Sequence, residues 1–324
     1  MKILFVSSGN SKEGISPIVR TQGLSLINQG IIVDFFTIKG KGFRGYLSNL
    51  SKLNATIRKI RPDIIHAHYS LSAYLATLAA AKPLVVSLMG SDVKLSYLSR
   101  ILMKALSKVY WRHIIVKSED MQKNMKIASL TVIPNGVDMD IFTPLDKMDS
   151  QNKIGWDINK QHILFAANPS RQEKNHALAH EAFILLNDKN AEMHSLSSVP
   201  LDQVPIWMNA ADVVILTSLW EGSPNVIKEA MACNRPIVAT NVGDIAWLFG
   251  DIEGCYLALF DEKNVTEKVR LALQFAQSKG KTNGRQRIEA LGLDSVTIAN
   301  KIIDVYKKTI NETHKSNKFN AKFI

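Results

Sequence analysis

The feature that most constrains the fold is an alternation of short, β-branched apolar runs with amphipathic helical stretches. The chain begins with the run KILFVSS, continues with IVRTQGLSLINQG as far as Gly30, and resumes with the run IIVDFFTI. The two runs have the composition of buried strands, and the stretch between them has helical spacing. Strands that alternate with helices form parallel sheets covered by helices on both faces. The sequence therefore predicts a doubly wound α/β fold.

The same alternation continues to about residue 145. The helical segment YLSNLSKLNATIRKIR stops before Pro62, and DIIHAHY and PLVVSLMG are the next predicted strands. Between these strands lies LSAYLATLAAA, which has eleven residues, whereas a membrane-spanning helix needs ~20. We expect a core helix there and a first α/β domain over residues 1–145.

A second unit repeats the pattern from residue 162. Its predicted strands are HILFAAN, DVVILTS and PIVATN, and its predicted helices cover residues 174–187, 202–210 and 224–233. Residues 146–161 belong to a stretch rich in Asp, Pro and Asn, which is typical of a linker. The pattern thus predicts a second Rossmann-like α/β domain over residues 162–294. The two parallel sheets are expected to face each other across an inter-domain cleft.

Composition agrees with two globular domains and narrows the location. The chain has 324 residues, of which 46% are apolar and 21% charged, enough for two packed cores. The N-terminal apolar run before Ser7 is too short for a signal peptide, so we expect a cytoplasmic protein. Cys233 and Cys255 are the only cysteines, too few for a metal site of their own, and we expect both to be structural.

Positive charge is concentrated in the first half of the chain. Residues 1–150 hold 20 Lys and Arg against 10 Asp and Glu, whereas residues 151–324 hold 20 against 19. The first half is therefore expected to meet any anionic surface. A nucleic-acid partner is not expected, because no aromatic-interleaved basic stretch or known binding motif accompanies the charge.

Residues 94–113 read as one basic amphipathic helix. The basic residues recur at four-residue intervals, and a neighbouring face is apolar. The basic residues are Arg100, Lys104, Lys108 and Arg112, and the apolar ones are Leu98, Ile101, Leu102, Ala105 and Val109. Such a helix can lie on an anionic bilayer. The alternative is an ordinary helix that packs its apolar face on the core and keeps its lysines in water.

The segment after DVVILTS has the marks of an anion site. Pro224 suits the first position of a helix, so the backbone N–H groups of Ser223 to Val226 are expected at the carboxyl edge of the sheet, where ligands of α/β folds bind. A helix N-terminus favours phosphate. Glu221 and Glu229 would repel phosphate, but eight helical residues span ~12 Å, which suits hydroxyls on either side of a diphosphate. Alternatively, Glu221 favours the helix dipole and Glu229 is a solvated helix residue.

Several motifs, in order along the chain, carry a family resemblance. They are Asp63-Ile-Ile-His-Ala-His68, Gly90-Ser-Asp92, the segment from Val132 to Pro144 (VIPNGVDMDIFTP), Glu173-Lys174-Asn175, Glu221-Gly-Ser-Pro-Asn with Glu229-Ala-Met-Ala, Pro236-Ile-Val-Ala-Thr and Val242-Gly-Asp. Together they resemble the retaining GT-B glycosyltransferases of family GT4. The resemblance implies transfer of a sugar from a nucleotide diphosphate sugar to an acceptor hydroxyl, with no metal and no other cofactor.

The resemblance also implies roles for single residues. Glu221 would contact the donor sugar, Glu229 the ribose hydroxyls, and Lys174 with a nearby arginine the diphosphate. From its place at a strand end with a glycine before it, Asp92 is expected either near the acceptor or as the cap of a turn. His66 and His68 lie on the strand DIIHAHY, where one is expected to face the core and the other the cleft on the acceptor side; alternatively, each is structural. The remaining donor-binding residues would be Gly14, Gly222, Ser223, Pro224, Asn225 and Val226. A C-terminal helix over residues 295–310 would cross back toward the first domain, followed by a frayed tail over 311–324.

Two positions depart from the family pattern. Pro169 stands where an arginine is usual, which leaves Arg171 as the local replacement, and Met89 stands where many relatives carry a histidine. An inactive homologue that binds a nucleotide sugar or glycan therefore stays open as an alternative. The resemblance otherwise favours assembly of bacterial surface polysaccharide or lipopolysaccharide, on a glycan or lipid-linked acceptor, with a peripheral position at the inner face of the plasma membrane.

Overall fold

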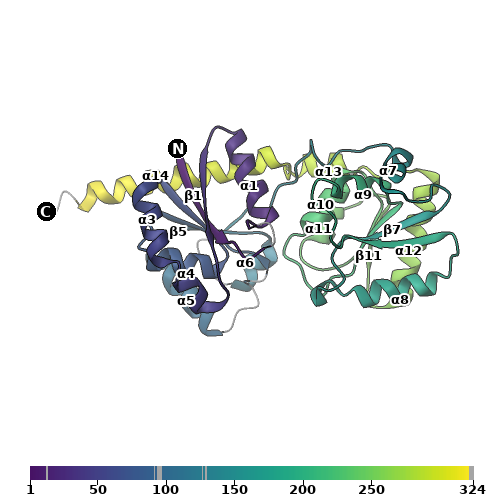
Figure 1. Cartoon of the computed structure of the whole chain (residues 1–324), viewed down its shortest axis with the longest axis horizontal. Coiled ribbons are helices and arrows are strands. Elements are labelled where there is room, and N and C mark those ends of the chain that lie inside the picture. Colours follow the sequence, from purple (N-terminus) through teal and green to yellow (C-terminus); the bar gives the residue numbers. More distant parts are fainter. Residues whose placement is uncertain (12–13, 91, 93–96, 126, 128–129, 321–324) are drawn as a thin grey trace. The chain divides into compact units, whose positions relative to one another are not determined.

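The computed structural model describes residues 1–11, 14–90, 92, 97–125, 127 and 130–320, and it divides into two units (Figure 1). The first unit comprises Met1–Gly136 and the segment that begins at Ser295, and the second comprises Val137–Asp294. Each unit is a parallel sheet with helices around it, so the predicted α/β class is confirmed.

The first sheet has six parallel strands in the order β2-β1-β3-β4-β5-β6. The strands are β1 (Lys2–Ser8), β2 (Ile32–Ile38), β3 (Ile64–His68), β4 (Leu84–Ser87), β5 (Trp111–Val116) and β6 (Leu130–Val132). The helices of this unit are α1 (Pro17–Asn28), α2 (Gly42–Leu47), α3 (Leu50–Ile60), α4 (Ser70–Leu78), α5 (Tyr97–Val109), α6 (Glu119–Met125) and α14 (Ser295–Asn320). The central strands are buried on both faces, which explains why they read as continuous apolar runs.

Local sequence explains where these helices begin and how closely they pack. Helix α1 starts with Pro17, and the hydroxyl of Ser16 accepts a hydrogen bond from the N–H of Val19. Gly23 is needed in that helix, because a Cβ there would lie 2.3 Å from the ring of Phe35. The core helix expected over 71–81 is α4, which buries one face on the sheet.

Helix α5 differs from its prediction in two ways. It ends at Val109, and Arg112 lies on strand β5, so the basic row does not continue along one helix. The face expected to be apolar is turned to solvent: Ile101, Leu102 and Val109 are 48%, 47% and 70% exposed. Met103, which is 1% exposed, packs on the core instead. Residues 93–96 lie outside the described part of the chain, as do the side chains of Leu98 and Arg100.

The C-terminal helix α14 packs within the first unit, against α1 and β5 (Figure 1). It continues to Asn320, ten residues past its predicted end, whereas residues 321–324 are outside the description. Ile302, Tyr306 and Thr309 are fully buried at helical spacing. These buried positions all lie within the predicted helix, and the frayed tail expected from residue 311 is wrong as far as Asn320, where the backbone is still helical.

The second sheet has five parallel strands in the order β11-β10-β9-β7-β8. The strands are β7 (Gln161–Phe165), β8 (Ala191–Ser195), β9 (Val213–Leu216), β10 (Ile237–Thr240) and β11 (Cys255–Ala258). The helices are α7 (Lys147–Ile154), α8 (His176–Leu186), α9 (Val204–Ala210), α10 (Asn225–Ala232), α11 (Ile245–Phe249), α12 (Glu262–Ser278) and α13 (Gly284–Ala290), with a short 3₁₀ turn, η2 (Gln172–Lys174).

The predicted linker 146–161 is wrong in its central part, which is a helix of the second unit. The carboxylate of Asp146 accepts a hydrogen bond from the N–H of Asp149 and caps α7. Gln151 is buried and donates to the carbonyl of Ala210 at the end of α9. The aspartate that suggested a loop is thus a helix cap. In the part of the chain that is described, no helix combines the length and apolarity needed to span a bilayer.

Candidate functional site

Two loops of the second unit meet at the carboxyl edge of its sheet. One follows β7 and includes η2, and the other follows β9 and leads into α10. The hydroxyl of Thr217 donates to the carbonyl of Asn175 at 2.8 Å, and the N–H of Leu219 donates to the carbonyl of Glu173 at 2.9 Å. These bonds hold together the two segments that carry most of the predicted donor-site residues.

Lys174 and Glu221 form an ion pair between these loops. The ammonium of Lys174 donates to Oε1 of Glu221, and the hydroxyl of Ser218 donates to the same oxygen at 2.7 Å. Only 10% of the lysine side chain and 13% of the glutamate side chain are exposed. The predicted diphosphate-binding cation and the predicted sugar-binding carboxylate therefore lie side by side.

Gly243 fixes the backbone beneath Glu221. A Cβ at Gly243 would lie 2.6 Å from the carbonyl oxygen of Gly222 and 3.0 Å from that of Glu221, and its φ of +62° is a conformation that favours glycine. The loop after β10 can therefore pack directly on the Glu221-Gly222 backbone.

Helix α10 begins one residue later than predicted. Pro224 occupies the capping position with φ −71° and ψ 118°, and Asn225 is the first helical residue. Asn225, Val226 and Ile227 form the first turn, whose backbone N–H groups have no partner within a helix. Gly222 and Pro224 are buried, while Ser223, Asn225 and Val226 are partly exposed.

Glu229 lies on α10 beside a second group of titratable side chains. Burial raises the pKa of the Glu229 carboxyl to about 7, although the neighbouring Lys228 opposes the shift. Lys228 is fully buried and donates to the hydroxyl of Ser223 at 3.2 Å, and its pKa is lowered by burial to about 8. The pKa of Asp244 is raised to about 6, again mainly by burial.

Sequence reasoning missed Lys228 and Asp244. Both residues belong to segments that the sequence had already singled out, since Lys228 precedes Glu229 and Asp244 ends the Val242-Gly-Asp motif. The signal for Lys228 is its place on the apolar side of an amphipathic helix, where it becomes fully buried.

The guanidinium of Arg171 is not part of the Lys174–Glu221 ion pair. Its guanidinium binds Glu173, with 2.6 Å between Nη2 and Oε1, and 57% of its side chain is exposed. Pro169 lies two residues before it in the turn made by Asn168, whose side chain accepts from the N–H and hydroxyl of Ser170. The main-chain carbonyl of Arg171 accepts from the N–H of Lys174 at 2.9 Å, but its guanidinium binds Glu173.

Asp92 is a buried cap in the first unit. Its Oδ1 accepts from the N–H and the hydroxyl of Ser70, at the start of α4, and its Oδ2 accepts from the N–H of Met89. Burial raises the pKa of Asp92 above its usual range, and the three hydrogen bonds oppose that shift. The side chain joins the end of β4 to the start of α4. The side chain of Met89 is itself buried.

The structural interpretation of His66 and His68 is confirmed, and the expectation that one of them faces the cleft is wrong. Residues two apart on a strand point to the same face, and the two rings stack at 4.4 Å, both fully buried. Hydrogen bonds join His66 Nδ1 to the Tyr306 hydroxyl at 2.6 Å and Nε2 to the Ser87 hydroxyl at 2.8 Å. Burial lowers the pKa of His66 to about 3 and that of His68 well below its usual value, and nearby Lys117, which the sequence analysis missed, adds to both shifts.

Gly14 closes a turn between β1 and α1. Its N–H donates to the carbonyl of Ser11 and its φ is +82°, with open space where a Cβ would lie. Residues 12–13 of this loop are outside the description.

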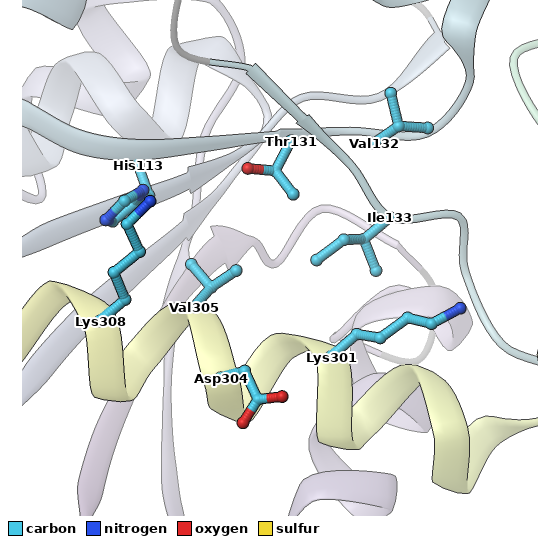
Figure 2. Close-up of a pocket in the computed structure, with 8 residues that line it drawn as sticks. All are labelled: His113, Thr131, Val132, Ile133, Lys301, Asp304, Val305 and Lys308. Carbon is cyan, nitrogen blue, oxygen red and sulfur yellow. The ribbon is translucent and has the colours of Figure 1, made fainter.

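A separate cavity of about 380 Å³ lies in the first unit, between β5, the strand β6 with its following residue, and α14 (Figure 2). Its wall is formed by His113, Thr131, Val132, Ile133, Lys301, Asp304, Val305 and Lys308. None of the predicted site residues lines it.

Comparison with protein families gives one match in each unit. A family described as "Glycosyltransferase Family 4" matches residues 9–141, and one described as "Glycosyl transferases group 1" matches residues 162–274.

Comparison with curated proteins gives relatives of the same class. The UDP-Gal:alpha-D-GlcNAc-diphosphoundecaprenol alpha-1,3-galactosyltransferase of Escherichia coli is 26% identical over 308 residues, which cover 80% of this chain and 79% of the relative. A Bacillus subtilis glycosyltransferase named for teichuronic acid biosynthesis, TuaC, is 26% identical over 221 residues. That alignment covers 60% of this chain and spans 57% of the length of TuaC.

Solved structures agree in fold. A sucrose-phosphate synthase from Thermosynechococcus elongatus superposes with a TM-score of 0.80 at 16% identity, over 96% of this chain and all of that one. Anabaena HepE in complex with UDP superposes with a TM-score of 0.72 at 19% identity, over 95% of this chain and all of that one. With a family match on each unit, and with this fold, the chain belongs to the group 1 glycosyltransferases of family GT4, which have the GT-B architecture.

Proposed function

We propose that this glycosyltransferase moves a sugar from a nucleotide diphosphate sugar to an acceptor hydroxyl with retention at the anomeric carbon. The second unit holds the donor, and the first unit holds the acceptor. The observation that carries the proposal is the Lys174–Glu221 pair at the carboxyl edge of the second sheet.

When a donor binds, Lys174 and Glu221 each replace their contact with one another by a contact with the donor. Removing two charges from water is costly, and each partner offsets the cost for the other in the free enzyme. A diphosphate carries about two negative charges and offers Lys174 a stronger partner than one carboxylate does. Glu221 is then free to accept hydrogen bonds from the hydroxyls of the transferred sugar.

The chemistry needs cations more than it needs a base. The bond between the anomeric carbon and the phosphate oxygen breaks, and the acceptor oxygen forms its bond on the same face of the sugar. The acceptor proton passes to the departing phosphate oxygen. Lys174 and the first-turn N–H groups of α10 stabilise the charge that develops on that phosphate, and no metal is required.

Glu229 is assigned to the ribose. A carboxylate on the first two turns of α10 can accept from both ribose hydroxyls, and the partial burial of Glu229 makes such hydrogen bonds strong. Ionising this carboxyl, whose pKa is about 7, is the cost of that contact in the free enzyme.

The names of similar proteins suggest which compounds to test first. The E. coli relative is named for UDP-Gal and a diphosphoundecaprenol-linked acceptor, and the HepE structure contains UDP. UDP therefore heads the donor panel, and an undecaprenol-linked acceptor heads the acceptor panel. We propose assembly of bacterial surface polysaccharide or lipopolysaccharide, in the cytoplasm, as the setting.

A thermal-shift panel of UDP, GDP, ADP and their sugar conjugates, without metal, tests the donor site. We expect one nucleotide to raise the melting temperature of the wild type, and the shift to disappear in Glu229→Ala. Glu267→Ala, an exposed glutamate on α12, is the matched control and should keep the shift. No shift with any nucleotide would contradict an active donor site. Binding without transfer to a synthetic lipid-linked acceptor would favour the inactive homologue.

We also propose that α5 contacts an anionic membrane surface. Ile101, Leu102 and Val109 are exposed on this helix, and Lys104 and Lys108 are exposed with them. Exposed apolar side chains next to lysines suit the headgroup region of an anionic bilayer, since the apolar groups enter the interface and the ammonium groups remain near phosphate. Such a contact would bring the first unit to a lipid-linked acceptor.

Vesicle pelleting separates this contact from general basicity. We expect stronger pelleting at low salt with phosphatidylglycerol vesicles than with phosphatidylcholine vesicles, and loss of the difference in Lys104→Glu/Lys108→Glu. Lys52→Glu/Lys59→Glu makes the same charge change on α3 and should retain most of the binding. Equal pelleting with both kinds of vesicle would rule out the contact.

A further inference from the structure

Three side chains with metal-ligating atoms converge on the edge of the second sheet. His162 lies on β7, and Glu192 and His194 lie on the edge strand β8. In the parallel register His162 pairs with Glu192, and His194 is two residues farther along β8, so all three side chains project from one face. The ligand atoms of the three lie within 4.8 Å of one another.

The ring of His162 is oriented for coordination. Its Nε2 is 2.8 Å from the carbonyl oxygen of Asp157, to which it donates, so Nδ1 carries the lone pair. That Nδ1 lies 3.0 Å from Nε2 of His194. A backbone carbonyl that accepts from the second ring nitrogen is the usual outer partner of a metal-bound histidine.

Glu192 is oriented by a lysine. Oε1 accepts from the ammonium of Lys160 at 2.5 Å, which leaves Oε2 directed at the two histidines, 3.8 Å from His162 Nδ1 and 3.7 Å from His194 Nε2. Two bonds of about 2.1 Å to one metal ion allow ligand atoms to lie up to about 4.2 Å apart. The three distances in the structure are all below that limit.

Aromatic neighbours hold the ring of His194 in place, and the site stays accessible to solvent on one side. The ring of His194 stacks on Trp156 at 3.8 Å, and Trp207 packs edge-on against Trp156. His162 is fully buried, but 20% of His194 and 35% of Glu192 are exposed, so an ion can enter from the β8 side.

The geometry points to a binding site for a divalent transition-metal ion, with Zn²⁺ as the best-fitting class, on His162 Nδ1, His194 Nε2 and Glu192 Oε2. Two imidazoles and one carboxylate with an open fourth position suit zinc, which is four-coordinate in proteins. When the ion binds, the proton shared by the two histidines moves to the other nitrogen of His194. The site is at the beginning of β7 and β8, whereas the donor-site loops follow the ends of β7 and β9, so its expected role is to brace the edge strand.

If the site binds no metal, His162 and His194 only form a hydrogen bond with each other, and titration with Zn²⁺ shows no saturable binding. Besides the fully buried His66 and His68, the second unit holds another histidine pair, His176 and His180, four residues apart on α8 with ring centroids 5.8 Å apart. Such a pair can bind metal weakly by itself. The test is therefore made in a His176→Ala/His180→Ala background, with the affinity tag removed and no nucleotide present.

Titration of this protein with Zn²⁺ by calorimetry, and with Ni²⁺ while tryptophan emission is recorded, tests the site. We expect one equivalent of Zn²⁺, quenching by Ni²⁺ because Trp156 stacks on a ligand, and a higher melting temperature with Zn²⁺. His194→Ala should weaken binding by at least about tenfold. Glu192→Gln changes a partly exposed side chain without altering its size, should weaken binding severalfold, and serves if His194→Ala folds poorly.

The proposal is overturned by any of three results. They are no saturable Zn²⁺ binding, an affinity that is unchanged in both variants, and binding that disappears when only the α8 pair is removed. Because no nucleotide or acceptor is present, none of these results depends on the donor site.

Discussion

The carboxyl edges of the two sheets carry polar residues in opposite states. In the first unit, Asp92 makes three hydrogen bonds to its own fold, and His66 is fixed between Ser87 and Tyr306. In the second unit, Lys174 and Glu221 neutralise each other across two loops. The first arrangement positions backbone, and the second holds opposite charges that a ligand can separate.

The difference shows in the pKa shifts as well. Burial keeps His66 and His68 of the first unit neutral, so these two side chains add no charge there at neutral pH. In the second unit, the pKa values of Asp244, Glu229 and Lys228 move to about 6, 7 and 8. Charges that are close to titration at neutral pH respond to a bound anion. We therefore expect substitutions to affect catalysis in the second unit and stability in the first.

The largest effect is expected at Lys174. In Lys174→Ala the diphosphate loses its cation, and kcat should fall by about 10²–10³, as for other residues that stabilise developing charge. Initial rates of donor consumption with a saturating acceptor measure this. Lys279→Ala, which breaks an exposed pair with Glu253, is the control and should leave kcat unchanged. A loss below about threefold in Lys174→Ala would contradict the assignment of the pair.

Asp92 should show the opposite behaviour. Asp92→Ala leaves the N–H groups of Ser70 and Met89 without their buried acceptor, so the free energy of unfolding should fall by about 2 kcal/mol. Denaturant unfolding followed by circular dichroism measures it. Asp63→Ala, which removes one exposed hydrogen bond to the N–H of Lys2, should cost less than half as much. Unchanged stability with a large loss of kcat would make Asp92 a residue of the reaction instead.

Much of this comparison could be predicted from the sequence, because strand and helix spacing locate the carboxyl edges. The loop from Leu219 to Pro224 and the start of α10 were placed to within one residue. The two ends of the Lys174–Glu221 pair were both identified, but 47 residues separate them, and no local pattern shows that they touch in the free enzyme.

What the sequence could not settle is which side of an element faces the core. Helix α5 has apolar residues on more than one side, and packing selected Met103 over Ile101 and Leu102. His66 and His68 obey the two-residue period of a strand, which places both on one face, contrary to the expectation. Arg112 continued the helical spacing but lies on β5, because spacing alone does not mark the end of α5.

A smaller effect is expected in the pH dependence of donor binding. Glu229 must ionise to accept from ribose hydroxyls, and its pKa in the free enzyme is about 7. As pH falls below 7, more of the free enzyme is protonated, so the Kd should rise by up to about tenfold per pH unit. Calorimetry between pH 5.5 and 8.5 with a nucleotide sugar, whose diphosphate does not titrate there, measures the trend. Glu229→Gln should flatten the curve, and an equal slope in that variant would assign the proton to another group.

The smallest effect is expected at Arg171, where the sequence and the structure give different answers. The resemblance assigns it to the diphosphate, but in the structure its guanidinium is held by Glu173 and more than half exposed. An exposed pair of this kind contributes about 0–1 kcal/mol, so Arg171→Ala should leave stability unchanged and raise the donor KM by no more than about threefold. Steady-state kinetics of Arg171→Ala, measured alongside Lys174→Ala, separate a role in binding the diphosphate from a pair with Glu173 alone. If Arg171→Ala lowers kcat as much as Lys174→Ala does, the guanidinium of Arg171 leaves Glu173 when the donor binds. In that case both edge loops rearrange around the diphosphate, and the change is not confined to the Lys174–Glu221 pair. If Glu173→Gln then raises kcat/KM, the Arg171–Glu173 pair is a restraint on that movement.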